Sequence, residues 1–321
     1  MRSAVYNKYG PPEVVSIVES KRPTLSSDDE VLIEVYASTV NRTDCSFRSA
    51  EYFINRVFAG LNGPKKKILG CEYSGLVIEI GNNVKRFKIG DAVFGFSGMN
   101  FGAHAEFISI KEKQPIDKVP EGLNYETAAA LTEGFHYAWN IVRAAQISSG
   151  QKVLVNGATG AIGSAAVQLS KYKGAHVTAV CETKHMDLVK SIGSDQVIDY
   201  TVNDFTQMND QFDVVLDAVG KSSFKKCSPL LKPKGIYVST ELGNYFQNPL
   251  LALITPFNFG KRVLFPIPSI TLSDMQLIKT LVQNRKFRPV IDRIYSLDQI
   301  VEAYQYVETG MKTGNVVIKI K

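Results

Sequence analysis

Hydrophobic and polar positions follow two different rhythms along the chain, and the first rhythm indicates β-structure. Short runs of β-branched and aromatic residues alternate with glycine and polar turns over residues 1 to about 110. This spacing predicts strands near 31–36, 74–80, 92–96 and 104–110. Short strands with such glycine punctuation are typical of a small barrel.

From about residue 150, short apolar runs alternate with segments of helical periodicity. The runs predict buried strands at 152–155, 176–180, 196–200, 213–217 and 236–239, the last introduced by Lys234-Gly235. Helices are expected from apolar positions at 162–169 and 186–192, closed by Gly174 and Gly193. Strand, helix and strand in this order predict a parallel sheet with right-handed crossovers.

One glycine-rich turn carries the strongest chemical signal. It follows the strand at 152–155, opens a helix, and has the spacing AxGxxG. Gly160 would let the backbone approach a pyrophosphate, and Gly163 would let the helix pack closely on the strand. Free N–H groups at the start of the helix would hold the phosphates. The candidate nucleotide-binding residues of this turn are Ala158, Thr159, Gly160, Ala161, Ile162 and Gly163.

The end of the second strand of this unit bears on the choice of nucleotide. An acid there holds the ribose of NAD, whereas NADP sites replace the acid and add a cation. Cys181 stands where the acid would fall, and Thr183 and Lys184 follow as candidates for contact with a 2′-phosphate. Glu182 argues the other way, because its carboxylate would repel that phosphate or take the ribose. We favour NADP(H) over NAD(H).

Composition and charge narrow the class of protein. The 321 residues, with 45% hydrophobic and 21% charged side chains, predict two globular domains and disfavour disorder, collagen and coiled coil. The net charge of +6 is mild and dispersed. It would suit an anionic small molecule, and we expect no nucleic-acid partner because the one short basic run, 65–67, has no aromatic interleaving.

Cysteine usage and hydropathy bear on the compartment. Cys45, Cys71, Cys181 and Cys227 lie far apart without a CxxC pair, which fits free thiols in a reducing compartment. No secretory signal or membrane span is evident, so we expect a cytoplasmic protein without a membrane partner. The proline-cut apolar stretch 245–268 is expected to be covered, by the mouth of a cleft or by another subunit.

Five motifs together resemble one superfamily over essentially the whole chain. They are GCEYSGLVIEIG, FKIGDAVFG, NGATGAIGSAAVQLSK, FDVVLDAVG and TGNVVIKI. The chain resembles the medium-chain dehydrogenase/reductase superfamily, in its zinc-free quinone oxidoreductase-like branch. The resemblance implies an α/β protein with a GroES-like β-barrel catalytic domain at 1–120 and 262–321, and a doubly wound Rossmann domain at 121–261. It also implies a homodimer or homotetramer.

The same resemblance assigns residues outside the glycine turn. Asn41 matches an active-site Asn whose amide would donate to a substrate oxygen, and Asp44 follows at the family's spacing as a structural residue. His136 stands where relatives set a Thr near the nicotinamide. It would act as a donor or general acid, or it is a buried histidine satisfied by backbone. Further cofactor contacts are implied at Tyr200, Val219, Thr240 and Asn315.

Position also bears on zinc. Asn41 and the pair Cys71-Glu72 stand at two of the family's zinc-ligand positions, and residues 125–150 contain no Cys for a third. Cys71 and Glu72 could bind a metal by spacing alone. We interpret them as structural and predict no metal.

These features predict an NADPH-dependent reductase that transfers hydride to a small quinone or α,β-unsaturated carbonyl. Such acceptors delocalise charge without a Lewis acid. Two alternatives remain open at this point. One is a zinc-independent alcohol or carbonyl oxidoreductase, and the other is an NADPH-binding protein whose main role is not catalytic.

Overall fold

A computed structural model describes residues 1–51, 53–258 and 260–321, and the chain forms two compact units. Unit 1 comprises 1–133, 270–283 and 291–321, and unit 2 comprises 134–269 and 284–290. The chain therefore leaves unit 1, builds unit 2 and returns. The domain boundaries expected from the sequence, at 120/121 and 261/262, stay a prediction.

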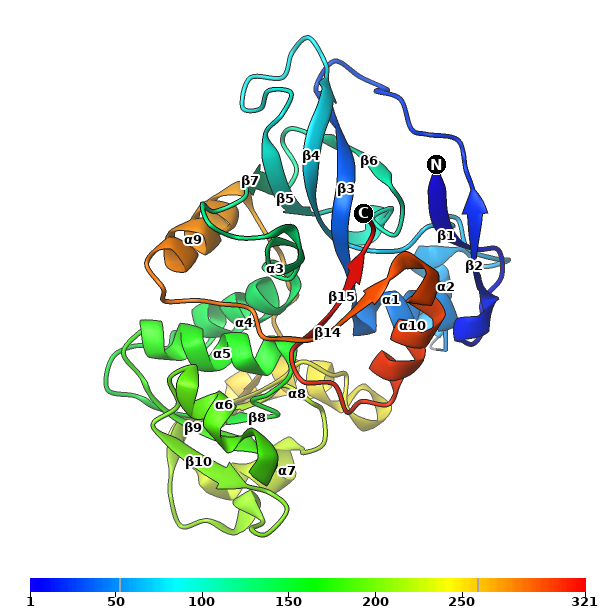
Figure 1. The fold of residues 1–321 in the computed structure, drawn as a ribbon. Coiled ribbons are helices and arrows are strands. Elements are labelled where there is room, and N and C mark those ends of the chain that lie inside the picture. The colour runs from blue at the N-terminus through cyan, green and yellow to red at the C-terminus, as the bar shows by residue number, and fades with distance from the viewer. Residues whose placement is uncertain (52, 259) are drawn as a thin grey trace. The chain divides into compact units, whose positions relative to one another are not determined.

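Unit 1 is built on a seven-stranded sheet. Its order is β14-β15-β3-β4-β5-β7, with β6 also paired to β3 (Figure 1). The strands are β3 (Glu30–Val40), β4 (Glu72–Ile80), β5 (Ala92–Phe96), β6 (Phe107–Lys111), β7 (Ile116–Lys118), β14 (Ile291–Ser296) and β15 (Asn315–Lys319). A separate antiparallel pair is formed by β1 (Arg2–Tyr6) and β2 (Val15–Glu19).

The long strand β3 organises this unit because it pairs antiparallel with β4, β6 and β15. Its apolar side chains enter the core together with those of neighbouring strands. The helices of unit 1 are α1 (Arg42–Ser49), α2 (Phe53–Ala59), α3 (Tyr125–Ala129), α9 (Leu272–Gln283) and α10 (Ile300–Glu308). Helix α1 begins directly after β3, which places its first turn at the end of the central strand.

Unit 2 is a parallel six-stranded sheet in the order β10-β9-β8-β11-β12-β13. Its strands are β8 (Lys152–Asn156), β9 (His176–Cys181), β10 (Gln196–Asp199), β11 (Phe212–Asp217), β12 (Leu231–Ser239) and β13 (Arg262–Leu264). Its helices are α4 (Glu133–Ala144), which starts in unit 1, α5 (Ala161–Tyr172), α6 (Met186–Ser191), α7 (Phe224–Cys227) and α8 (Gln247–Ile254). The order reverses at β8, as in a doubly wound sheet.

The predicted strands and helices of both units are confirmed, with two corrections. The strand expected at 104–110 begins at Phe107, because His104 instead contacts the backbone carbonyl of Thr39 at 2.8 Å. Strand β12 begins at Leu231, so Lys234-Gly235 lies inside it. The register with β11 is irregular there and Lys234 adopts a φ of 66°, which explains why this pair resembles a turn.

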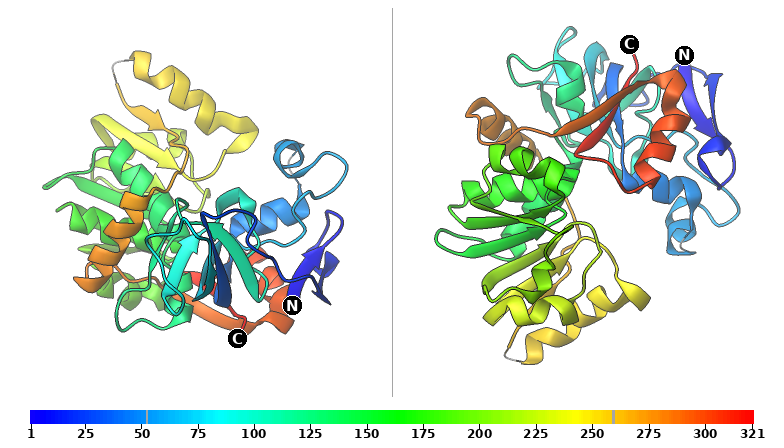
Figure 2. Two further views of the ribbon diagram at one scale, coloured as in Figure 1. Left: turned by 90° about the horizontal axis from the view of Figure 1, so that it is seen from above. Right: turned by 60° about the horizontal axis from the view of Figure 1, so that its bottom comes forward.

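The apolar stretch 245–268 forms α8 and the edge strand β13, which lie side by side in Figure 2. Tyr245 and Phe246 both have positive φ, and Tyr245 is 99% exposed. Other large apolar side chains exposed along the described part of this stretch are Leu250, Leu253, Ile254, Phe257 and Ile267. No helix in the described ranges is long and apolar enough to cross a membrane.

Candidate functional site

The glycine turn of unit 2 forms an open backbone cradle at the start of α5. Gly160 is the N-cap residue, with extended backbone and no side-chain cap, so the first N–H groups of α5 have no cap acceptor. Gly157 adopts a φ of 75°. A Cβ on Gly163 would lie 2.1 Å from the carbonyl oxygen of Gly157, so only glycine allows this close packing of helix on turn.

Asp217 fixes the neighbouring loop against this turn. Its buried carboxylate accepts hydrogen bonds from Asn156 Nδ2 at 3.0 Å and from the backbone N–H groups of Gly220 at 3.0 Å and Val219 at 3.3 Å. The side chain of Val219 then lies over Gly157, where a Cβ would meet it at 2.8 Å. The structure therefore brings Val219 together with the predicted glycine turn.

Thr240, the predicted contact after β12, carries an unsatisfied group. Its hydroxyl is buried and has no hydrogen-bond partner among the described residues. A buried hydroxyl without a partner costs free energy, which a ligand atom would remove. The uncapped helix start and this hydroxyl fit a dinucleotide bound at the carboxyl ends of the strands.

The predicted residues Lys184 and Tyr200 converge on one acid. Glu182 follows β9 directly, and its carboxylate lies 2.8 Å from the Lys184 ammonium and accepts a 2.7 Å hydrogen bond from the Tyr200 hydroxyl. These two contacts lower the pKa of Glu182. Thr183 is turned away from this group and donates its hydroxyl to Asp199. We call Glu182, Lys184 and Tyr200 the strand-end triad.

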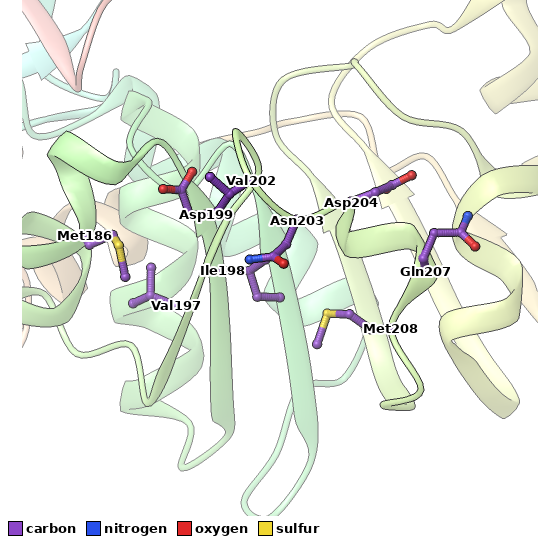
Figure 3. Close-up of a pocket in the computed structure, with 9 residues that line it drawn as sticks. All are labelled: Met186, Val197, Ile198, Asp199, Val202, Asn203, Asp204, Gln207 and Met208. Atoms are coloured by element: carbon purple, nitrogen blue, oxygen red, sulfur yellow. The ribbon is translucent and has the colours of Figure 1, made fainter.

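A cavity of about 710 Å³ lies at the β10 edge of unit 2 (Figure 3). None of the predicted nucleotide-binding residues lines it. Met186, Val197 and Met208 give it apolar walls, while Asp199 and Asp204 add carboxylates. Carboxylates repel phosphate, so this cavity does not suit the phosphates of a nucleotide.

In unit 1, a buried polar cluster surrounds Asn41 at the end of β3. The Asn41 side-chain oxygen accepts the Asp44 N–H as the N-cap of α1, which directs its amide nitrogen to Cys71 Sγ at 3.0 Å. Cys71 lies 3.1 Å from one carboxyl oxygen of Glu133, and Thr43 donates to the other at 2.9 Å. One amide hydrogen of Asn41 is used on the sulfur, which leaves one for a further acceptor.

Glu72 belongs to the same cluster but faces a different set of donors. Its carboxylate accepts from the Thr39 hydroxyl at 2.6 Å, from the hydroxyl and N–H of Thr132 at 2.7 and 3.0 Å, and from the Glu133 N–H at 2.6 Å. Glu72 is fully buried. It therefore ties β3 and β4 to the start of α4.

Burial sets the protonation of this cluster. It raises the pKa of Glu133 to about 8, with the neighbouring Glu72 adding to the shift, and it raises the pKa of Asp44 to about 7. It also raises the pKa of the Cys71 thiol well above its usual value. Desolvation lowers the pKa of Lys312, whereas Glu133 acts to raise it. The cluster holds protons that exposed carboxyls would have released at neutral pH.

The residues at this place do not fit a tetrahedral zinc centre. Asn41 presents N–H rather than a lone pair to the sulfur, and the carboxylate of Glu72 is taken by hydroxyl and backbone donors. Within the described ranges, no group of three or more His, Cys, Asp or Glu is arranged to hold a metal ion.

The remaining predicted residues lie apart in the fold. His136 is buried in the first turn of α4 and belongs to unit 2, with its ring 4.7 Å from that of Tyr137. Asn315 is the buried first residue of β15 in unit 1. Their contacts with cofactor or substrate stay predictions.

Glu133 is the residue of this cluster that sequence reasoning missed. A search for a cysteine between 125 and 150 passes over it, although a carboxyl is an equally ordinary partner for a thiol. The available signal was its position, an acid at the start of an apolar helix, following the buried segment 128–132. Its proximity to Cys71 depends on the tertiary fold.

Two family models match the chain. The model described as an alcohol dehydrogenase GroES-like domain matches residues 27–121, and the one described as a zinc-binding dehydrogenase matches residues 192–318. The second description names zinc, which the side chains around Cys71 do not fit.

Two curated relatives and one solved structure agree with these matches. The 2-methylene-furan-3-one reductase of Solanum lycopersicum is 31% identical, across 99% of this chain and 79% of the relative. The NADPH-dependent alkenal/one oxidoreductase of Arabidopsis thaliana, a chloroplastic protein, is 28% identical with the same coverage. The quinone oxidoreductase structure from Coxiella burnetii superposes with a TM-score of 0.89 at 27% identity, covering 100% of this chain and 99% of that one.

The chain belongs to the medium-chain dehydrogenase/reductase superfamily, in its quinone oxidoreductase-like branch. It combines a GroES-like unit with a Rossmann-like parallel sheet. Its family and the glycine cradle of unit 2 both support binding of a pyridine nucleotide.

Proposed function

We propose that this chain is an NADPH-dependent reductase of quinones or α,β-unsaturated carbonyl compounds that works without a metal. The observation that carries the proposal is the uncapped glycine cradle at the start of α5, which offers free N–H groups where a dinucleotide phosphate binds in this family's fold. The named activities of the tomato and Arabidopsis relatives support the substrate class.

The chain's own residues would hold the nucleotide at three places. The N–H groups of Gly160, Ala161 and Ile162 bind the pyrophosphate, with Thr159 beside them and with Ala158 and Gly163 keeping helix and strand close. Lys184 and Tyr200 receive the adenosine end, and the Lys184 ammonium gives NADP(H) its advantage over NAD(H). Thr240 supplies the hydroxyl that has no protein partner.

The reaction needs an acceptor that is already electrophilic. When bound, the reduced nicotinamide supplies a hydride to the electron-poor carbon of a quinone or enone. Asn41 has one amide hydrogen free for the oxygen on which negative charge develops, because Cys71 holds the other. His136 is the second proposed donor. No Lewis acid is required, in keeping with a cluster in which Cys71 and Glu133 satisfy each other.

Cofactor oxidation followed at 340 nm tests this proposal directly. We expect turnover with NADPH against panels of quinones and enals, and little against simple aldehydes and ketones. Turnover confined to the aldehyde panel would replace the proposal with an alcohol or carbonyl oxidoreductase. NADPH binding without turnover on any panel would indicate a non-catalytic role. A metal chelator should leave the rate unchanged, and a rate lost to chelator and restored by zinc would contradict metal independence.

We also propose a cytoplasmic homo-oligomer, a dimer or tetramer. The exposed apolar side chains of α8 border the edge strand β13, and an unpaired sheet edge beside an apolar patch suits a second copy of the chain. All four cysteines are free thiols, which suits a reducing compartment. Light scattering measures the mass of the assembly, and cell fractionation tests the compartment.

A further inference from the structure

The strand-end triad already satisfies both groups that the nucleotide is expected to use. Both carboxyl oxygens of Glu182 are engaged, Oε2 with the Lys184 ammonium at 2.8 Å and Oε1 with the Tyr200 hydroxyl at 2.7 Å. The three side chains remain accessible, with Lys184 61% and Tyr200 50% exposed. A ligand can therefore reach the triad without unfolding it.

The other acid nearby does not share this role. Asp199 accepts hydrogen bonds from Thr183 and from the hydroxyl and N–H of Thr201. Its oxygens are held by neutral donors and leave Lys184 to Glu182. Glu182 is thus the charged group that a 2′-phosphate would meet at Lys184.

A phosphate and a carboxylate compete for the same ammonium. A 2′-phosphate can pair with Lys184 only if Glu182 turns away or stays close and repels it. A ribose with a free 2′-hydroxyl meets no such conflict, since a carboxylate accepts hydrogen bonds from hydroxyls. The same side chain therefore acts against NADP(H) and in favour of NAD(H).

We propose that Glu182 is a specificity-determining residue that occupies Lys184 and Tyr200 and so limits the preference of this chain for 2′-phosphorylated nucleotides. The inference rests on the proposed function, because it assumes that nucleotide binds at the end of β9. It predicts that the wild-type chain discriminates weakly between NADPH and NADH. Contacts with Lys184 and Tyr200 lower the pKa of Glu182, so it carries its negative charge at neutral pH.

Isothermal titration calorimetry on the full chain tests this with two minimal probes. Adenosine 2′,5′-bisphosphate carries the 2′-phosphate, and adenosine 5′-monophosphate lacks it. We expect Glu182→Gln to shift the ratio of the two dissociation constants by roughly three- to tenfold in favour of the bisphosphate, the size of an exposed charge contact. NADPH against NADH should shift in the same direction, and added salt should shrink the effect.

Two further variants separate the contact from a change in net charge. Asp187→Asn removes the same charge from the exposed first turn of α6, where Asp187 has no ion pair or side-chain hydrogen bond within the described ranges, and should leave the ratio unchanged. Lys184→Ala should weaken the bisphosphate and abolish the gain from Glu182→Gln, since the gain acts through that ammonium.

The outcomes keep this inference and the proposed function apart. If both probes bind and Glu182→Gln leaves their ratio unchanged, or Asp187→Asn shifts it equally, the role of Glu182 is overturned while the nucleotide site stands. A gain that persists in the Lys184→Ala background also overturns it. If wild type binds neither probe nor NADPH, the proposed function fails, and the inference fails with it.

Discussion

Two acids, each close to a strand terminus, show how environment decides what a carboxyl group does. Glu133 in unit 1 and Glu182 in unit 2 each contact two side chains through both oxygens. Burial raises the pKa of Glu133 to about 8, while contacts with an ammonium and a phenol at an exposed site lower the pKa of Glu182. The first is built to keep a proton and the second to keep a charge. Three changes test this contrast.

The largest effect is expected where the buried cluster loses its main acceptor. Glu72→Ala removes the carboxylate that accepts from Thr39, Thr132 and Glu133, and leaves those donors buried and unsatisfied. We expect unit 1 to lose about 3 kcal/mol or more of its free energy of unfolding. Hydrogen exchange of β3 and β4 peptides measures this unit separately. Glu79→Ala, an exposed acid on the same strand, is the control and should cost less than about 0.5 kcal/mol.

The second effect is a pH dependence with a defined sign. Between pH 7 and 8 the folded chain retains a proton on Glu133 that the unfolded chain has released, so the stability of unit 1 falls as pH rises. The slope is at most about 1.4 kcal/mol per pH unit for one group. Burial lowers the pKa of His104 to about 4, so its opposite contribution acts only below about pH 6.5.

Glu133→Gln should flatten this slope in the exchange of β3 and β4 peptides. The control is Glu121→Gln, an exposed acid before α3. A wild-type slope that survives in Glu133→Gln would mean that another group holds the proton, and the contrast with Glu182 would lose one side.

The smallest effect is expected at the exposed acid. Glu182→Gln should change the stability of unit 2 by less than about 0.5 kcal/mol, because exposed ion pairs contribute little. Urea unfolding followed by the fluorescence of Trp139, the single tryptophan and a residue of unit 2, measures this. A loss of 2 kcal/mol would show that the strand-end triad supports the fold rather than only the choice of ligand.

The sequence predicts the nucleotide turn well because the signal is local. Strand β8, the glycines at 157, 160 and 163, and helix α5 are consecutive, and their spacing alone implies the cradle. The strand-end triad is also partly visible, since Glu182 and Lys184 are near neighbours with opposite charges. Its completion by Tyr200 requires β10 to pair beside β9, which the predicted parallel sheet makes reasonable.

The polar cluster of unit 1 is less visible for the opposite reason. Asn41, Cys71 and Glu133 are separated by long stretches and meet only because β3 pairs with β4 and α4 starts beside them. Periodicity identifies these strands but not which of their ends meet. The edge strand β13 and helix α8 were likewise hidden in an apolar stretch whose prolines and glycine suggested no regular element.

The pairing of β15 with β3 has a consequence for the birth of the protein. Val316 lies opposite Val40 in the sheet, so the central strand of unit 1 waits for a partner that the ribosome makes long afterwards. The strands of unit 2 are all synthesised in between. The nucleotide-binding unit can therefore fold during translation, whereas β3 keeps one edge open until β15 emerges. Early chaperone contacts should concentrate on this edge, and its closure marks the completion of the molecule.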